Sequence, residues 1–261
     1  MNHKPRKRFG QNFLTDTTAL QNIALAINPK DGQHIIEIGP GQGALTEYLL
    51  KKQIKLDVIE LDRDLVTLLT EKYKNTNNIT IHSGDALNFN FDIFKNSEKK
   101  IRIVGNLPYN ISSPLLFKLF DHLSIVEDML FLLQKEVVDR LTADVNTKHY
   151  GRLSIMSQYF CNSFKVLDIK PTSFYPPPKV NSAFIHMIPI ERTLKADDFK
   201  HFSDIVRQAF CYRRKMISNS LKDTISPDQL ETLGINPHAR PQELSIDDYI
   251  RISNLLSITL K

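Results

Sequence analysis

The sequence of 261 residues is short of cysteine and of long apolar segments. Cys161 and Cys211 are its only cysteines, which excludes a disulfide framework and a cysteine-rich zinc site. Each follows a phenylalanine, so we expect small buried hydrophobic side chains in a reducing compartment. No apolar run approaches the ~20 residues of a membrane-spanning helix, and the basic N-terminus is not followed by the apolar segment of a secretory signal. We therefore expect a cytoplasmic protein without a membrane partner.

Glycine is also scarce, with 9 residues in the chain, about half the usual share of roughly 7%. Three of them lie within the pentapeptide Gly39-Pro40-Gly41-Gln42-Gly43. Glycine costs backbone entropy, but it permits positive φ and lets a ligand approach the backbone closely. The cluster therefore indicates a turn whose geometry, or whose ligand, requires glycine.

The net charge of +5 is carried by the two ends of the chain. Residues 1–10 carry +4, residues 11–191 carry −1 and residues 192–261 carry +2. A near-neutral body with basic ends is typical of a protein that holds a polyanion at its periphery. Basic ends that only keep the chain soluble are the alternative, and the charge does not choose between the two.

Strand-like and helix-like segments alternate from residue 19 to residue 141, which predicts an α/β fold with a mostly parallel, Rossmann-like sheet. The expected strands are His34–Ile38, Leu56–Leu61, Ile79–His82, Ile101–Val104 and Met129–Leu133, and the expected helices are Ala19–Ile27, 44–52, Leu65–Tyr73, Pro114–Leu123 and Lys135–Leu141. Two later β-like segments, Phe164–Ile169 and Ala183–Ile188, are expected at an antiparallel edge of the sheet.

From about residue 191 the pattern is helical only. The expected helices are Phe199–Phe210, Met216–Leu221, Pro227–Leu233 and Ile246–Leu256. The predicted organisation is thus a basic arm (1–15), a Rossmann-like domain (16–190) and a small all-helical C-terminal domain (191–261).

Three consecutive strand ends carry groups suited to a nucleoside, and ligands of open α/β sheets bind at the carboxyl ends of strands. The first carries Gly39 and Gly41, and the helix that follows offers unpaired N–H groups to an anion. The second ends in Glu60, whose carboxylate can accept hydrogen bonds from both ribose hydroxyls. The third leads to Asp85, which can accept from an adenine amino group. The glycine pattern also fits the dinucleotide fingerprint G-x-G-x-x-G/A, so a nicotinamide cofactor stays an open alternative.

The fourth predicted strand is followed by Asn106-Leu107-Pro108-Tyr109, which resembles the [Asn/Asp/Ser]-x-Pro-aromatic motif of S-adenosylmethionine-dependent methyltransferases that modify nucleic-acid amines. An exocyclic amine is a poor nucleophile because its lone pair is delocalised into the ring. The side-chain oxygen of Asn106 and the carbonyl of Leu107 can accept hydrogen bonds from that amine and hold it toward tetrahedral geometry. Pro108 fixes φ and has no N–H, and Tyr109 can stack on an extruded base. A proline loop with a core tyrosine is the alternative.

A second aromatic candidate is Phe174, which opens the proline-rich segment Phe174-Tyr175-Pro176-Pro177-Pro178. The prolines hold such a segment stiff and extended. Phe174 is predicted to stack on the opposite face of the base. The alternative is a rigid connector with a core phenylalanine.

Several longer stretches resemble the ribosomal RNA adenine dimethyltransferases, and most closely those that act on the small subunit. The stretches are Arg6–Leu14, Asn106–Ser112, Gln134–Val137, Gly151–Ser154, Pro176–Val180 and Arg213–Lys215. The resemblance implies a Rossmann-like, S-adenosylmethionine-dependent methyltransferase domain that dimethylates N6 of two adjacent adenosines in the 3′-terminal hairpin of 16S rRNA, with a role in small-subunit biogenesis. It also implies that no metal takes part and that S-adenosyl-L-methionine is held by Asn12, Leu14, Gly39, Gly41, Glu60, Asp85 and Asn106.

The resemblance further implies contacts between basic side chains and rRNA phosphates. The expected residues are Arg6, Lys7 and Arg8 in the arm and Arg207, Arg213, Arg214 and Lys215 in the helical domain. Without the resemblance, the second group is better interpreted as a solvated helix face. The expected partner is the small ribosomal subunit with its 16S rRNA, bound by a monomer.

Three other functions fit parts of this pattern. They are a large-subunit rRNA adenine methyltransferase of the macrolide-resistance type, a ribosome-assembly factor with secondary catalysis, and a nicotinamide-dependent oxidoreductase. The intact tetrad argues against the oxidoreductase, which has no use for it.

Overall fold

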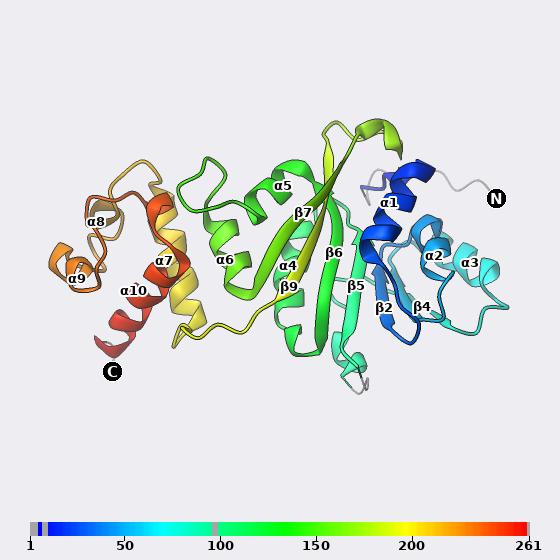
Figure 1. The fold of residues 1–261 in the computed structure, drawn as a ribbon, viewed down its shortest axis with the longest axis horizontal. Helices are drawn as coiled ribbons and strands as arrows, with labels where there is room; N and C mark the ends of the chain where they lie inside the picture. Colours follow the sequence, from blue (N-terminus) through cyan, green and yellow to red (C-terminus); the bar gives the residue numbers. More distant parts are fainter. Residues whose placement is uncertain (1–4, 7–9, 96–98, 260–261) are drawn as a thin grey trace. The chain divides into compact units, whose positions relative to one another are not determined.

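The computed structural model describes residues 5–6, 10–95 and 99–259 (Figure 1). The chain divides into two compact units, one of Met1–Val138 and Ser163–Pro189, the other of Asp139–Asn162 and Ile190–Lys261. Within the described ranges, no helix is both long enough and apolar enough to cross a membrane.

The first unit is built on a seven-stranded sheet with the strand order β4-β3-β2-β5-β6-β9-β7 (Figure 1). The strands are β2 (His34–Ile38), β3 (Lys55–Glu60), β4 (Ile79–Ser83), β5 (Ile101–Asn106), β6 (Val126–Gln134), β7 (Cys161–Ile169) and β9 (Ser182–Pro189). Strands β2 to β6 are parallel, and β9 pairs antiparallel with β6, which confirms the predicted mixed sheet. The strand order reverses between β2 and β5, so the carboxyl ends of these two strands border the crevice where such sheets bind ligands.

In the chain the helices of the first unit precede β2 or follow a strand of the sheet, and the last of them extends past Val138 into the second unit. They are α1 (Thr17–Ile27), α2 (Ala44–Leu49), α3 (Arg63–Lys72), α4 (Ser112–Phe120) and α5 (Lys135–Leu141), with short 3₁₀ turns η2 (Phe91–Phe94), η3 (Leu123–Ile125) and η4 (Pro171–Ser173). Helix α1 begins where the Asp16 carboxylate accepts from the N–H groups of Thr18 and Ala19. It ends at Asn28, which is in the left-handed region.

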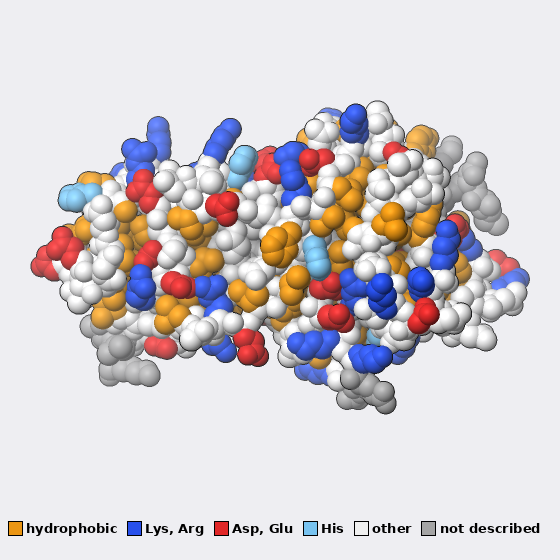
Figure 2. All heavy atoms as spheres, viewed as in Figure 1, with side chains coloured by type: hydrophobic (Ala, Val, Ile, Leu, Met, Phe, Trp, Pro, Cys, Tyr) orange, Lys and Arg blue, Asp and Glu red, His pale blue; other side chains and the backbone are white. Residues whose placement is uncertain are grey.

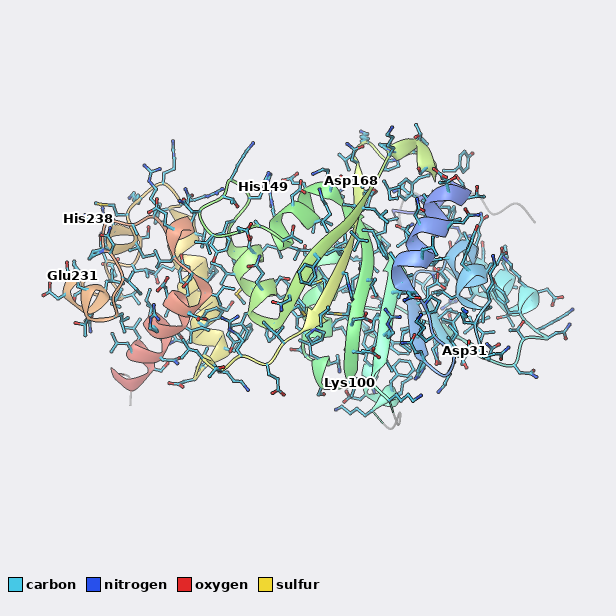
Figure 3. All side chains as sticks on the ribbon, in the orientation of Figure 1. Asp31, Lys100, His149, Asp168, Glu231 and His238 are labelled. Carbon is cyan, nitrogen blue, oxygen red and sulfur yellow. The ribbon has the colours of Figure 1, made fainter. Side chains whose placement is uncertain are left out.

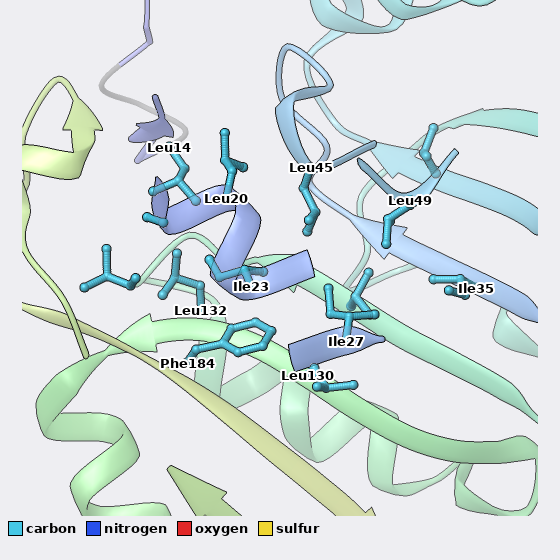
Figure 4. Packing of buried hydrophobic residues seen from close by; sticks show 14 of the residues in the cluster. Leu14, Leu20, Ile23, Ile27, Ile35, Leu45, Leu49, Leu130, Leu132 and Phe184 are labelled. Carbon is cyan, nitrogen blue, oxygen red and sulfur yellow. The ribbon is translucent and has the colours of Figure 1, made fainter. Parts of the chain in front are cut away.

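One face of α1 is buried against the sheet and fixes the start of the domain. Ile23 and Ile27 of α1 lie beside Leu130, Leu132 and Phe184 of the strands (Figure 4). Each such side chain contributes ~1.5–3 kcal/mol when it is fully buried. The segment that precedes α1 is therefore tied to a firmly packed element.

A two-stranded antiparallel ribbon, missed by the sequence prediction, joins the arm to the proline-rich segment. It consists of β1 (Phe13–Leu14) and β8 (Phe174–Tyr175), with Phe13 opposite Tyr175 and Leu14 opposite Phe174. Side chains alternate between the two faces of a strand, so Leu14 and Phe174 share one face and are buried, while Tyr175 on the other face is exposed.

The second unit is helical and includes more of the chain than residues 191–261. Its helices are α6 (Arg152–Phe160), α7 (Phe199–Cys211), α8 (Ile217–Ser220), α9 (Pro227–Thr232) and α10 (Ile246–Thr259), with the 3₁₀ turn η5 (Pro241–Glu243). The sequence prediction did not include α6. The ring of Tyr159 in α6 lies 5.0 Å from that of Phe202 in α7, and the hydroxyl of Tyr150 donates to the carbonyl of Leu244 at 3.1 Å. These contacts explain why Asp139–Asn162 belongs to this unit.

Candidate active site

The glycine cluster forms the turn between β2 and α2, and its backbone requires glycine. Gly39, Gly41 and Gly43 have φ of 70°, 59° and 81°, a region that side-chain-bearing residues avoid. A Cβ at Gly41 would also lie 3.0 Å from the ring of Phe13. The turn thus brings bare backbone to the strand end, beneath the arm.

A cavity of about 310 Å³ lies at the carboxyl ends of the strands. Its wall includes all the residues predicted to hold a cofactor and all four members of the tetrad: Asn12, Leu14, Gly39, Gly41, Glu60, Asp85, Asn106, Leu107, Pro108 and Tyr109. Segments far apart in the sequence therefore meet at one site, and the arm contributes residues 10–15 to its wall.

Glu60 is buried at the end of β3 and linked to the glycine turn. The N–H of Gly41 donates to its Oε2 at 3.2 Å, and the N–H of Asp62 donates to its Oε1 at 2.9 Å. Burial raises the pKa of Glu60, and the two backbone donors oppose that rise. The carboxylate keeps lone pairs for further donors.

Glu37 and Phe13 also line the cavity, although the sequence prediction did not name them as site residues. Glu37 is buried, and the Thr46 hydroxyl donates to its Oε2 at 2.6 Å. Burial raises the pKa of Glu37 to about 7. A single acidic residue inside the apolar run His34–Ile38 is the signal that could have identified it. For Phe13 there was no such signal, because a two-residue strand has no periodicity.

Asp85 lies at the turn after β4. Its Oδ1 accepts from the N–H of Leu87 at 2.9 Å, and its Oδ2 accepts from Nδ2 of Asn88 at 2.8 Å. Because an ionised carboxylate has about four acceptor positions, these bonds orient the group and leave capacity for a ligand.

Hydrogen bonds orient three members of the tetrad, Asn106, Leu107 and Tyr109. Nδ2 of Asn106 donates to the backbone carbonyl of Asn12 at 3.0 Å, and the N–H of Leu107 donates to the carbonyl of Leu132 at 3.2 Å. The hydroxyl of Tyr109 is hydrogen-bonded to that of Ser182 at 2.7 Å. Burial raises the pKa of Tyr109, with the Ser182 bond acting against the rise.

Phe174, the predicted second stacking residue, is not brought to the cavity wall. Its side chain is 4% exposed and packs in the same hydrophobic cluster as Leu14. The exposed aromatic of this segment is its neighbour Tyr175, at 64%.

The basic residues predicted to contact RNA have varied surroundings. Arg6 forms ion pairs with Asp62, at 3.0 Å, and with Asp64, whereas Lys7 and Arg8 lie outside the described residues. Arg207 pairs with Asp204 at 3.1 Å.

In the second unit, Arg213 is engaged with its own unit. It donates to the carbonyl of Lys148 at 2.7 Å and to Oε1 of Gln242 at 2.9 Å. Figure 3 places His149 on the loop to which Arg213 donates. Arg214 and Lys215 are exposed, and Nζ of Lys215 lies 4.5 Å from the ring centre of Tyr212. In Figure 2 basic side chains are spread over the visible face with acidic ones among them.

The seven-stranded sheet with its helices is that of the S-adenosylmethionine-dependent methyltransferase fold. Within this class the chain belongs to the family described as ribosomal RNA adenine dimethylase, whose model matches residues 2–257. Membership of this family of methyltransferases excludes the nicotinamide-dependent alternative.

Individual relatives are similar over nearly their whole length. A protein named ribosomal RNA small subunit methyltransferase A from Coxiella burnetii is 51% identical over 253 residues, which is 97% of this chain and 98% of the relative. The protein of the same name from Vibrio cholerae is 47% identical over 262 residues, with 100% and 97% covered. A crystal structure of a dimethyladenosine transferase from Plasmodium falciparum has a TM-score of 0.80 at 28% identity and covers 95% of this chain and 98% of that one. A 23S rRNA methyltransferase shares the fold, with a TM-score of 0.74 at 23% identity, 94% of this chain and 100% of that chain being covered.

Proposed function

We propose that the chain transfers methyl groups from S-adenosyl-L-methionine to N6 of two adjacent adenosines in the 3′-terminal hairpin of 16S rRNA, as a step in small-subunit biogenesis. The proposal rests on the cavity, whose wall contains the tetrad, the glycine turn and Glu60. Full-length relatives named as small-subunit methyltransferases support the choice of subunit. The proposed form of the enzyme is a cytoplasmic monomer.

The cavity suits a methyl donor of this kind. With positive φ at Gly39 and Gly41, the backbone of the glycine turn forms part of the cavity wall. A Cβ at Gly41 would occupy the space between this backbone and the ring of Phe13. Glu60 would hold the ribose hydroxyls and Asp85 the adenine amino group, because carboxylates accept hydrogen bonds. Asn12 and Leu14 would cover the cofactor from the arm. When bound, S-adenosyl-L-methionine supplies a methyl group activated by its positive sulfonium.

The tetrad would prepare the amine. Oδ1 of Asn106 and the carbonyl of Leu107 would each accept a hydrogen bond from one N–H group of the adenine amine. These bonds would direct the nitrogen lone pair at the methyl carbon. The methylated amine is acidic enough to lose a proton to water, so the site needs no strong base.

Base stacking is assigned to Tyr109 on one face of the adenine. Its ring is fixed by the Ser182 contact, and a positioned aromatic face is what an extruded base requires. Stacking by Phe174 would require its ring to leave the hydrophobic cluster it shares with Leu14. The role of Phe174 therefore stays a prediction.

The test is methyl transfer in vitro. The protein is incubated with labelled S-adenosyl-L-methionine and unmethylated small subunits, large subunits or naked rRNA, and the labelled nucleosides are mapped. We expect dimethyladenosine on small-subunit rRNA. Label on large-subunit rRNA would support the macrolide-resistance type, and tight small-subunit binding without label would support an assembly factor; either result would overturn the proposal.

A further inference from the structure

The arm is held to the rest of the first unit on both sides of Asn12. On one side Nε2 of Gln11 donates to Oδ2 of Asp62 at 3.0 Å, and Nη1 of Arg6 lies 3.0 Å from Oδ1 of the same carboxylate. On the other side β1 pairs with β8. Between these attachments the carbonyl of Asn12 accepts from Nδ2 of Asn106. The backbone position of Asn12 is therefore set by contacts outside the tetrad.

Asp62 is the residue on which one attachment converges. Its side chain is 1% exposed, and its Oδ1 also accepts from the N–H of Asp64 as the N-cap of α3. Its own N–H donates to Glu60. A buried carboxylate with several charge-assisted bonds holds its partners more firmly than an exposed ion pair does. Asp62 thus joins the arm to the strand end that carries Glu60.

The contact with Asn12 decides which way the amide of Asn106 faces. A backbone carbonyl has no proton to donate, so the amide atom beside it must be the NH₂ group. Oδ1 then faces away from the arm as an acceptor. The flipped amide would set two oxygens against each other and would offer donors to an amine that needs acceptors.

We propose that Asp62 is a positioning residue for methyl transfer. It anchors the arm so that the Asn12 carbonyl holds the Asn106 amide in the orientation that presents Oδ1 to the target amine. The inference rests on the proposed function for its effect on turnover. Its structural part, the mutual dependence of the arm and Asn106, is separate from the identity of the substrate.

The structural part is tested without any substrate. Asn106→Asp replaces the donating NH₂ with an oxygen that repels the Asn12 carbonyl, so we expect faster amide hydrogen exchange in residues 10–14 by mass spectrometry. Asp62→Asn should have the same effect, and asparagine keeps the cap of α3. The matched control is Lys74→Ala, which removes an exposed ion pair with Glu71 and should leave exchange of the arm unchanged. Arm exchange in Asp62→Asn equal to that of the unaltered protein would overturn the proposal.

The functional part is tested by steady-state kinetics on small subunits. Arg6→Ala and Asp62→Asn should each lower kcat about 10-fold or more at saturating cofactor, because small misplacements of a reacting group are costly. In the double variant the losses should be less than multiplicative, since both changes act through one attachment. An unchanged kcat in both single variants would refute the positioning role. If the unaltered protein methylates no rRNA, the proposed function fails, and the exchange experiment still tests the arm.

Discussion

Glu37 shows how one buried side chain can make the stability of the fold depend on pH. Burial raises its pKa to about 7, although the Thr46 hydroxyl lowers it in part. The folded state therefore holds this proton at pH values where the unfolded chain has lost it, and stability falls as the pH rises toward 7. Above pH 7 the folded state holds Glu37 as a buried, charged carboxylate, and the loss of folding stability is complete.

Glu37→Gln removes this dependence, because glutamine is neutral and can still accept from Thr46. The free energy of unfolding of the variant minus that of the unaltered protein should grow by about 1–3 kcal/mol when the pH is raised from 5 to 8. Urea unfolding at the two pH values measures the change. The exposed Glu71→Gln variant is the control and should show no such growth. A difference that is the same at both pH values would contradict this account of Glu37.

Residues whose chemistry is local could be predicted from the sequence. Gly39, Gly41 and Asn106 carry their meaning in a short motif, and the structure brings all three to one cavity. Phe174 could not be placed in this way, because its burial depends on pairing with Leu14, a contact between residues distant in sequence. The ion pairs of Arg6 with Asp62 and Asp64 could not be predicted either, because these residues are also distant in sequence.

Among the elements, the β1–β8 ribbon places two neighbouring aromatic side chains, Phe174 and Tyr175, on opposite faces. Phe174→Ala removes a buried ring and should destabilise the protein by about 3–5 kcal/mol. Tyr175→Ala removes an exposed ring and should change stability by about 0.5 kcal/mol or less. Thermal unfolding of the two variants measures both values, and equal losses would show that the ribbon faces are assigned wrongly.

The pairing of β2 with β5 depends on a glycine that the motif analysis did not interpret. Gly105 lies opposite Ile38, and a Cβ at this position would be 2.3 Å from the Ile38 carbonyl oxygen. Gly105→Ala should therefore force the strands apart, next to the tetrad. We expect a loss of about 2–3 kcal/mol or a failure to fold.

A matched glycine controls this prediction. At Gly84 a Cβ would meet its nearest neighbour, Phe89, at 3.9 Å, which is ordinary contact. Gly84→Ala should be nearly neutral in denaturant unfolding. If Gly105→Ala is equally neutral, the close approach of the two strands is not a constraint on the fold.

Elements marked by an apolar run or by a helical pattern were predictable from the sequence, and irregular elements were not. His34–Ile38 and Lys135–Leu141 were predicted with their observed bounds. Helix α6 was missed because two of its four buried residues, Ser154 and Ser157, are polar and interrupt the apolar pattern. Its place is set by packing in the second unit, which a sequence pattern does not contain.

At the scale of the whole molecule, the predicted RNA contacts of the helical unit divide into two kinds. Arg213 is bound to the carbonyl of Lys148, so Arg213→Ala should loosen that loop. Arg214 and Lys215 are exposed and suited to phosphate contact. Arg214→Gln with Lys215→Gln should weaken small-subunit binding and reduce its salt slope by about 1–2. Binding measured over a range of salt concentrations tests this, and an unchanged slope would remove both residues from the interface.

Mass spectrometry of the 3′-terminal rRNA fragment tests whether the tetrad cavity dimethylates two adjacent adenosines of 16S rRNA. Unmethylated small subunits are incubated with S-adenosyl-L-methionine and either the unaltered protein or Asn106→Ala. We predict that the unaltered protein adds four methyl groups, two on each adjacent adenosine. Asn106→Ala should bind the cofactor and add essentially none. Full methylation by Asn106→Ala, or an unmodified fragment after incubation with the unaltered protein, would contradict the account.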